Sequence, residues 1–547
     1  MKLQSSILRN SLFVLTLTLA LGTVRLPAQD KADTTATQEK QSKVQPGFRK
    51  LPRDNEGLEK AQEGPDFLRR RQDWFFKPRA FPLGFIPQGA RERALQQKIQ
   101  MYQREGRLGQ FGITKEPGFV TPPLGPTSAW FPIGPQPTAT TLFDFSQNGG
   151  ATSGRVTALV MNPSNANNVY LGGADGGLWV TTDGGTTWTP LTDNPANSGI
   201  PTIAVGSLAV DPTTCGASVC TTVYVGTGEG NFGAENIYGE GVLKCAITTG
   251  TPPSAVCTQD NTFHAVSPLS SVRGGPSIGA LAVNPAAGKS NILLAGVRGL
   301  AGTTIQSGIW CSADSGVTWS RVLPTSASAS DPGTDVAFAS DGTAWVALGN
   351  PFGDATNNGI YKSSAVVSSC SITFTAQILP AGTPASKLGR ITLAIFPSPT
   401  STGANAAVYA AMADSSTTSS NLLGVIKTTN GGTTWTQLTG DTRLSINGIC
   451  NAQCFYDIPM AVSPVSANDV FIGGAANNGT LIRSTDGGAT WTEISRNDVT
   501  GATDSIHVDM HAIAFSANGA TMFVGNDGGV WKTAAPTGTP AAGFWTT

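Results

Sequence analysis

The chain has 547 residues, of which only 13% are charged, about half of the roughly 25% that is usual, while 65 are glycine. This composition is typical of a turn-rich all-β protein. The net charge of −1 conceals a basic segment, residues 1–115, with 21 Lys and Arg against 11 Asp and Glu; because both signs alternate along it, we exclude a nucleic-acid-binding tail.

The first 28 residues are typical of an export signal. A basic start that ends at Arg9 precedes an apolar run over 12–21, and cleavage is expected after Gly22 or after Ala28. The run is too short to anchor the chain in a bilayer, and no later run reaches about 18 apolar residues. We therefore expect 1–28 to be a signal peptide, the mature protein to be secreted or periplasmic, and no membrane insertion after cleavage.

Residues 29–125 form a basic N-terminal arm and a Pro-rich linker. The part up to about residue 63 is polar and poor in apolar residues, which predicts disorder. Residues 91–107 predict a helix, and 121–126 an extended linker. Since the remainder of the chain is acidic, we expect the arm to dock onto its own domain.

A short pattern, [Ser/Thr]-x-[Asp/Asn]-x-Gly-x-x-Trp, recurs four times after residue 126. The copies begin at Thr181, Ser312, Thr428 and Ser484, and each lies between two apolar runs. This arrangement predicts a β-hairpin whose turn is fixed by the Asp or Asn and the Gly, with the Trp folded back beside it. The residues expected to be structural are Asp183, Trp188, Asp314, Trp319, Asn430, Trp435, Asp486 and Trp491.

Each copy ends a longer unit of four predicted strands. In residues 155–193 the strands are 156–160, 168–171, 178–180 and 188–191, and four strands in this order make one propeller blade. Degenerate copies of the unit open near residues 208, 281, 335, 391, 460 and 511. The predicted fold is therefore an all-β propeller of about seven four-stranded blades over residues 126–547.

The ends of the propeller leave two interpretations open. Trp130 and its neighbours resemble a fourth strand that would complete the last blade, yet Phe544 and Trp545 already look like that strand. Either the sequence is a fragment of a longer protein, truncated at its C-terminus, or Trp130 packs beneath the ring. The fragment interpretation is favoured.

Eight cysteines, an even number in an exported chain, favour disulfides. The local pairs are Cys215 with Cys220, Cys245 with Cys257, and Cys450 with Cys454. The second pair flanks a place where the turn pattern is missing, so a disulfide there is expected to hold the turn instead. Cys311 and Cys370 are left over and are candidates for free thiols. Without any Cys-x-x-Cys pair, no metal site is expected.

The four copies resemble Asp boxes, the BNR repeats of sialidases, xyloglucanase-like glycoside hydrolases and sortilin-type propellers. The resemblance covers roughly residues 128–547 and implies a secreted bacterial Asp-box propeller. It does not imply an activity, because the box recurs in enzymes and in pure binding proteins.

In a propeller, the loops from second to third strands and the entries to first strands share one face around the channel. The candidates from the loops are Asp175, Glu229, Glu240, Arg298, Asp354, Asp414 and Asp527. Those from the entries are Arg155, Arg273, Arg390, Asp457, His507 and Asp509.

Among these candidates, the pattern His507-Val-Asp509-Met-His511 gives the strongest local indication of a functional site. In a strand, positions two apart share a face, so both imidazoles and the carboxylate would line the channel and could transfer protons or bind a metal. The alternative is a strand entry in which His and Asp bond each other and the neighbouring blade. Asp175 and Asp527 open matching Asp-Gly-Gly loops, which either admit a ligand closely or are simply good turns.

Glycoside hydrolysis needs two carboxylates about 5–10 Å apart. The catalytic candidates are Asp175, Asp527, Glu229 and Asp509. Xyloglucanase-like enzymes, however, place a catalytic Asp where this chain has Ala174, and their second carboxylate belongs to a second propeller. The sialidase Arg triad is conceivable at the strand entries, but the usual Phe/Tyr-Arg-Ile-Pro entry is missing.

The predicted function is that of an exported propeller which binds a polysaccharide or a peptide on its channel face, without catalysis or a cofactor. The predicted ligand-binding residues are Arg155, Asp175, Glu229, Arg298, His507, Asp509, His511 and Asp527. The alternatives are a glycoside hydrolase with channel-face carboxylates and a structural or surface-assembly module. The oligomeric state is not predicted.

Overall fold

The computed structural model describes residues 138–139 and 151–547, apart from 194, 198–199, 201, 231–236, 264–275, 300–304, 327–330, 351–356, 381–386, 416–419, 445–447, 477–480, 498, 500–501 and 503. These residues belong to one of the two compact units of the chain, 63–547. The predicted signal peptide, the arm with its helix at 91–107, and Trp130 lie outside the described residues.

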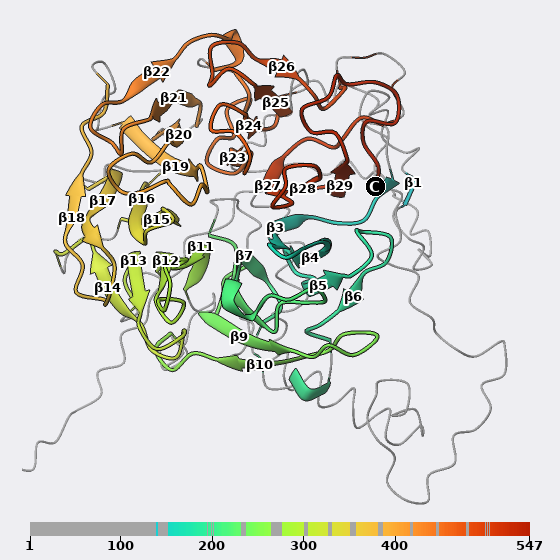
Figure 1. Ribbon diagram of the computed structural model, residues 1–547, viewed down its shortest axis with the longest axis vertical. Helices are drawn as coiled ribbons and strands as arrows, with labels where there is room; N and C mark the ends of the chain where they lie inside the picture. The colour runs from blue at the N-terminus through green and yellow to red at the C-terminus, as the bar shows by residue number, and fades with distance from the viewer. Residues whose placement is uncertain are drawn as a thin grey trace, which may run out of the picture. The chain divides into compact units, whose positions relative to one another are not determined.

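Seven antiparallel blades surround a central axis, so the prediction of a seven-bladed propeller is confirmed (Figure 1). The strands are, blade by blade, β3 (Val156–Asn162), β4 (Asn165–Gly173), β5 (Gly177–Thr181) and β6 (Thr189–Pro190); β7 (Val205–Val210), β8 (Thr222–Thr227), β9 (Val242–Ile247) and β10 (Ala255–Gln259); β11 (Ser277–Val283), β12 (Leu293–Arg298), β13 (Gly308–Ser312) and β14 (Ser320–Leu323); β15 (Gly333–Phe338), β16 (Thr343–Leu348), β17 (Gly359–Val366) and β18 (Phe374–Ala376); β19 (Leu388–Ile395), β20 (Val408–Asp414), β21 (Leu422–Thr428) and β22 (Thr436–Leu438); β23 (Met460–Val462), β24 (Val470–Gly473), β25 (Leu481–Ser484) and β26 (Thr492–Glu493); and β27 (Met510–Phe515), β28 (Met522–Asn526) and β29 (Gly529–Thr533).

The remaining elements are short. A two-stranded ladder joins β1 (Thr138–Ala139) to β2 (Ala151–Thr152), and three-residue 3-10 turns occupy η2 (Pro195–Asn197), η3 (Pro212–Thr214) and η5 (Thr442–Leu444). Over the described ranges, no helix has the length and apolar character needed to cross a membrane.

The ring closes between blade 7 and blade 1. First strands of successive blades pack side by side, and β27 lies against β3 in the same way (Figure 1). The fourth strand position of blade 7 is filled by an isolated bridge between Lys532 and Thr546, as the sequence of Phe544 and Trp545 led us to expect. In the described part of the chain, each blade is therefore built from consecutive residues.

Glycines in the second strands allow neighbouring blades to approach closely near the axis. A Cβ added at Gly226 would lie 2.8 Å from Ile278 of blade 3, and one at Gly525 would lie 2.6 Å from Val156 of blade 1. Real Cβ atoms do not approach other atoms this closely. Equivalent clashes would occur at Gly172, Gly296 and Gly473. The recurrent glycine of the repeat thus serves packing between blades.

The four copies of the sequence pattern, which we call the turn motifs, are hydrogen-bonded turns between third and fourth strands. In the first, the Asp183 carboxylate accepts the N–H of Thr187 at 2.9 Å and its hydroxyl at 2.6 Å. Partial burial acts against ionisation of Asp183, but the hydrogen bonds from Thr187 and Thr181 outweigh it and lower the pKa to about 2. Asn430 likewise accepts the N–H of Thr434 through Oδ1, while its Nδ2 donates to the Thr434 hydroxyl.

Each turn motif is also attached to the preceding blade. The rings of Trp435 in blade 5 and Trp345 in blade 4 meet edge to face, with centroids 6.0 Å apart. A lysine on a third strand donates to a turn-motif carbonyl of the next blade: Lys427 to Gly487 at 2.5 Å and Lys532 to Gly184 at 2.9 Å. The motif tryptophans Trp319, Trp435 and Trp491 are buried, whereas Trp188 is half-buried.

Four disulfides are present, including the three local pairs. Cys245 and Cys257 face each other across β9 and β10 in blade 2, one of the three blades that lack a turn motif. The expectation of free thiols at Cys311 and Cys370 is wrong, because these residues form the fourth disulfide. Cys311 lies on β13 and Cys370 follows β17 of the next blade, so the bond links two blades across 59 residues of sequence.

We expect Trp435→Ala to lower the free energy of unfolding by about 3–5 kcal/mol, because the buried ring fills the space between blades 4 and 5. Trp188→Ala should cost less, since that ring is half-buried. Urea unfolding measures both values. Equal losses for the two variants would contradict this account of the turn motifs.

We expect Gly525→Ala to destabilise the protein by about 1–3 kcal/mol, because the new methyl group must displace Val156 where the ring closes. Gly216→Ala is the control, since an added Cβ there has no atom within 4 Å. Its effect on urea unfolding should stay within about 0.5 kcal/mol. A Gly525→Ala protein as stable as the control would refute the role assigned to this glycine.

Candidate functional site

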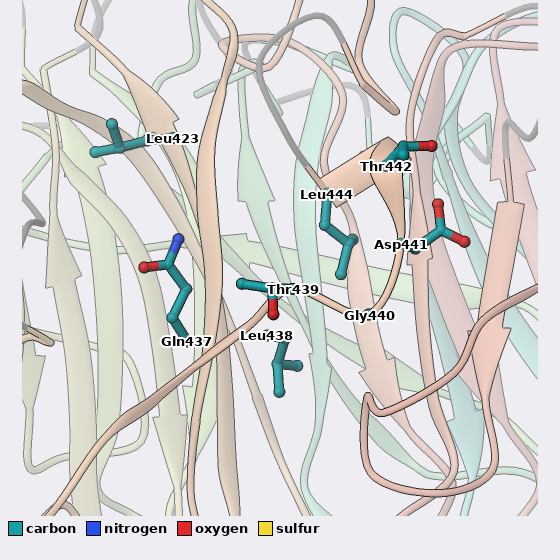
Figure 2. A pocket seen from close by; sticks show the side chains of 8 residues that line it. All are labelled: Leu423, Gln437, Leu438, Thr439, Gly440, Asp441, Thr442 and Leu444. Atoms are coloured by element: carbon teal, nitrogen blue, oxygen red, sulfur yellow. The ribbon is translucent and has the colours of Figure 1, made fainter.

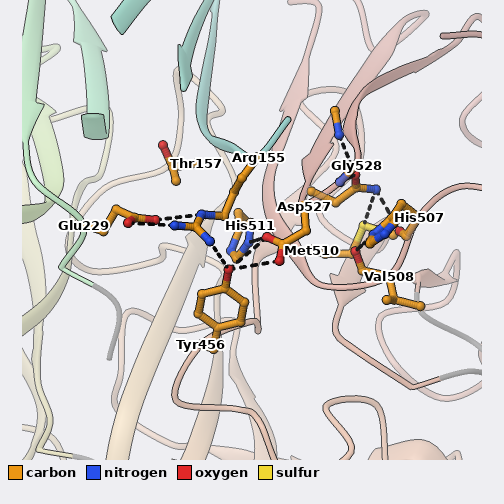
Figure 3. A network of polar contacts seen from close by, with 12 residues as sticks. Arg155, Thr157, Glu229, Tyr456, His507, Val508, Met510, His511, Asp527 and Gly528 are labelled. Atoms are coloured by element: carbon orange, nitrogen blue, oxygen red, sulfur yellow. Dashed lines mark hydrogen bonds and ion pairs between the residues drawn. The ribbon is translucent and has the colours of Figure 1, made fainter. Parts of the chain in front are cut away.

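A network of charged and polar side chains lies where first strands begin and second strands end, in four adjacent blades (Figure 3). It consists of Arg155 before β3, Glu229 after β8, Tyr456 before β23, His511 on β27 and Asp527 after β28. We call these five residues the polar cluster. They come from blades 1, 2, 6 and 7, and therefore flank the closure of the ring.

Arg155 and Glu229 form a two-point ion pair. Nε and Nη2 of Arg155 each lie 2.9 Å from a different oxygen of Glu229. The Glu229 side chain is 2% exposed, against 15% for Arg155. Burial raises the pKa of Glu229 to about 7, although the charge and hydrogen bond of Arg155 act in the opposite direction. The pKa of Glu229 thus lies close to neutral pH, where the protonated and ionised forms of the side chain are both accessible.

Tyr456 lies at the centre of the polar cluster. Its hydroxyl accepts a hydrogen bond from Nη1 of Arg155 at 3.0 Å and donates to the Asp527 carboxylate, whose oxygens are 2.9 and 3.1 Å away. Its ring meets the His511 ring edge to face, with centroids 4.6 Å apart. Nη1 of Arg390 donates to the Tyr456 carbonyl at 2.5 Å. The side chain and the backbone of this tyrosine are therefore both fixed.

His511 and Asp527 form a pair in which the imidazole is buried and the carboxylate is partly exposed. Nε2 of His511 lies 2.7 Å from Oδ1 of Asp527. Burial lowers the pKa of His511, with the bond to Asp527 opposing the shift. Burial would raise the pKa of Asp527, but the hydrogen bond and charge of His511, with Arg155 and Tyr456, outweigh it and lower the pKa. At neutral pH a neutral imidazole therefore donates from Nε2 to an ionised carboxylate.

The first strand of blade 7 explains how His511 reaches this position. The register of β27 with β28 shifts between Met510 and Ala512, so His511 occupies a β-bulge, which redirects a side chain. Similar shifts occur on the first strands of most other blades, for example around Thr157 and Thr334, whose hydroxyls bond to the first strand of the next blade.

A second layer of charged groups lies next to the polar cluster. Arg390 is 8% exposed and interacts with Asp335 and Asp457. Burial raises the pKa of Asp335 to about 6, against the hydrogen bonds from backbone N–H groups and the charge of Arg390. Asp457 directly follows Tyr456, and its carboxyl group contacts that of Asp509.

Four of the predicted ligand-binding residues meet in the polar cluster: Arg155, Glu229, His511 and Asp527. Of the other strand-entry candidates, Arg390, Asp457 and Asp509 lie in the second layer. The sequence analysis missed Tyr456, whose only signal is an aromatic ring directly before Asp457 at a strand entry.

Three of the predicted ligand-binding residues belong neither to the polar cluster nor to the second layer of charged groups. Asp175 is exposed, Arg298 ends β12 in blade 3, and the His507 ring contacts the Val508 carbonyl at 2.9 Å. Because β27 begins only at Met510, His507 and Asp509 precede the strand, and the period-two argument applies to His511 alone. Arg273 and Asp354 lie outside the described residues.

Within the described ranges, no group of three or more His, Cys, Asp or Glu residues is arranged to hold a metal ion. A surface depression lies elsewhere, at the third and fourth strands of blade 5 and the turn that follows them (Figure 2). It is lined by Leu423, Gln437, Leu438, Thr439, Gly440, Asp441, Thr442 and Leu444. None of these residues belongs to the polar cluster.

No protein-family model and no curated protein matches the chain. Solved structures resemble it in fold. A GH74 enzyme from Niastella koreensis is 20% identical over 72% of this chain and 54% of its own, with a TM-score of 0.47. The GH74 xyloglucanase from Xanthomonas campestris is 17% identical with the same coverages and a TM-score of 0.48.

A third similar structure is YCF48 from Cyanidioschyzon merolae, 15% identical over 70% of this chain and 96% of its own, with a TM-score of 0.40. The chain spans about half the length of the GH74 structures that it matches. Identities at this level concern the propeller fold and not the activity.

The raised pKa of Glu229 predicts a pH dependence. A carboxyl group whose pKa is higher in the folded state contributes stability at low pH that is lost as the pH rises through the folded pKa, here about 7. We expect the free energy of unfolding to fall between about pH 5 and about pH 8, and to fall less in Glu229→Gln. Urea unfolding at both pH values measures this, with the exposed Asp193→Asn as control. Identical pH dependence in Glu229→Gln and the wild type would contradict it.

Proposed function

We propose that this chain is an exported propeller that binds a polar ligand, a glycan or a short peptide, at the polar cluster without hydrolysing it. The observation that carries the proposal is the gathering of charged side chains from four blades at one end of the ring, with Arg155 15% and Asp527 23% exposed. The four disulfides support export, since such bonds persist in oxidising compartments.

The partly exposed groups are held by buried partners. Glu229 fixes the guanidinium of Arg155, while Tyr456 and His511 fix the carboxylate of Asp527. A ligand that meets them does not have to order these side chains, which lowers the entropic cost of binding. A cationic donor and an anionic acceptor held together suit ligands that carry both donors and acceptors, such as sugar hydroxyls or peptide amides.

The same bonds disfavour catalysis. A general acid must reach the atom that it protonates, but Glu229 is almost fully buried and both its oxygens face Arg155. Asp527 already accepts hydrogen bonds from Tyr456 and His511. Each carboxyl group therefore has internal partners that a substrate would have to displace.

One observation favours a glycoside hydrolase as the second candidate. Glu229 has its pKa raised to about 7, whereas the pKa of Asp527 is lowered. Glycosidases use a protonated carboxyl group and an ionised one, whose pKa values are separated by their surroundings. An experiment on function should therefore record binding and cleavage together.

The test incubates the full chain with plant, bacterial and sialylated polysaccharides and with a panel of short peptides. Retained protein and new reducing ends are measured in the same tubes. We expect retention on at least one ligand and no new reducing ends. Asp527→Asn and Arg155→Gln should each weaken retention about tenfold, which corresponds to about 1.4 kcal/mol.

The matched control is Asp486→Asn, the same chemical change in a turn motif at the other end of a blade. Asn430 fills the equivalent position naturally, so the turn should tolerate the amide. New reducing ends that vanish in Glu229→Gln would establish the hydrolase instead. Absence of retention on every ligand, or equal loss in the control, would refute the binding proposal.

A further inference from the structure

Asp457 is a fully buried carboxyl group for which the described structure offers no N–H or O–H donor. The residue is 0% exposed, and neither of its oxygens has a hydrogen-bond partner. An ionised carboxylate in such a position is costly, because it has lost water without gaining compensating donors. Asp457 is also joined directly to Tyr456, the central residue of the polar cluster.

The nearest partner of Asp457 is another carboxyl group. The carboxyl group of Asp509 lies next to that of Asp457, close enough for a hydrogen bond if one of the two is protonated. Asp509 has a positive φ of 61°, which is uncommon for a residue other than glycine, and its carbonyl lies 3.3 Å from the N–H of Asp527. The loop before β27 is thus held in a strained conformation with Asp509 against Asp457.

The described charges that act on Asp457 are two carboxylates and one guanidinium, which is itself shared. The charged and titratable groups that act on Asp457 are Asp509 before β27, Arg390 on β19 and Asp527 after β28. Arg390 is shared with Asp335 and also donates to the Tyr456 carbonyl. The other nearby cation, Arg155, is paired with Glu229. A single proton between Asp457 and Asp509 supplies the missing donor and removes one negative charge.

We propose that Asp457 and Asp509 share one proton, and that this pair is a positioning device that holds Tyr456 in the polar cluster. The step from Tyr456 to ligand binding rests on the proposed function; the shared proton itself does not. Burial, followed by the charge and hydrogen bond of Asp509, raises the pKa of Asp457 well above its usual value, which agrees with a proton retained at neutral pH.

The sign of the pH effect follows from this arrangement. The folded chain binds a proton that the unfolded chain releases above the usual Asp pKa of about 3.9. The contribution of the pair to stability is therefore present in acid and is lost as the pH rises through the raised folded pKa. Once that proton is lost, two carboxylates repel each other next to Tyr456, and the hydroxyl contacts with Arg155 and Asp527 weaken.

Glu229 and Asp335 also have raised pKa values, of about 7 and about 6, so their pH effects have the same sign. The pH dependence of the wild type alone therefore does not isolate the pair. The coupling between Asp457 and Asp509 isolates the pair, because the effects of substituting two residues that share one proton are not additive.

The experiment measures the Tm of the full chain between about pH 5 and about pH 8 for the wild type, Asp457→Asn, Asp509→Asn and the double variant. We expect the Tm of the wild type to fall by several degrees over this range and that of each single variant to fall less. The double variant should show no further reduction of the pH dependence. Asp486→Asn, in a turn motif, should retain the pH dependence of the wild type. Wild-type pH dependence in Asp457→Asn, or additive effects of the two substitutions, would overturn the proposal.

A second measurement leaves both residues of the pair in place. Infrared spectra of the Glu229→Gln protein at about pH 8 report the C=O stretch of any carboxyl group that remains protonated above its usual pKa. We expect this band to be present in the folded protein and absent after unfolding. A folded protein without the band would refute the shared proton even if Asp457→Asn failed to fold.

Ligand retention then tests the positioning role. Retention of the wild type, on whichever polysaccharide or peptide binds, should weaken once the pH exceeds that at which the infrared band disappears, whereas retention of Asp457→Asn should change less. Equal pH profiles would remove the link between the pair and Tyr456. If no ligand is retained at any pH, the proposed function fails, while Tm and infrared spectra still decide the shared proton.

Discussion

The closeness of the blades at the axis is the constraint on which the rest of this structure depends. Glycines such as Gly226 and Gly525 remove the side chains that would separate the second strand of one blade from the first strand of the next. Because successive first strands then lie side by side, residues at their entries come from four blades into bonding distance. The burial of Glu229 and His511, and hence their shifted pKa values, follows from the same closeness.

The outer parts of the blades are stabilised mainly by bonds between residues that are close together in the sequence. A turn motif needs only eight consecutive residues, since Asp183 bonds to Thr181 and Thr187 within its own hairpin. Blade 2 replaces this turn by a disulfide between strands that face each other, Cys245 to Cys257. Attachment to the preceding blade comes from buried rings such as Trp435 and from lysines such as Lys427. The periphery can therefore vary while the centre remains tightly packed.

This division explains what could be predicted from the sequence. Blades and turns are encoded by neighbouring residues, so the sevenfold repeat and the Cys245–Cys257 bond could be recognised. The polar cluster depends on partners far apart in the chain: Arg155 and Tyr456 are 301 residues apart. Strand position alone placed Arg155, Glu229, His511 and Asp527 on one face, but it gave no reason to choose Tyr456. The Cys311–Cys370 bond was missed because it joins two blades.

The polar cluster spans the seam at which the last blade meets the first. Arg155 belongs to blade 1 and Asp527 to blade 7, and the described blades exchange no strand across this junction. The seam is held by contacts such as Gly525 against Val156 and Lys532 on Gly184, none of them covalent. A molecule bound to both Arg155 and Asp527 would hold blades 1 and 7 together. By mass action, opening of the ring would become less favourable as the concentration of that molecule rises. Binding would then raise the force and the temperature needed to unfold the whole propeller.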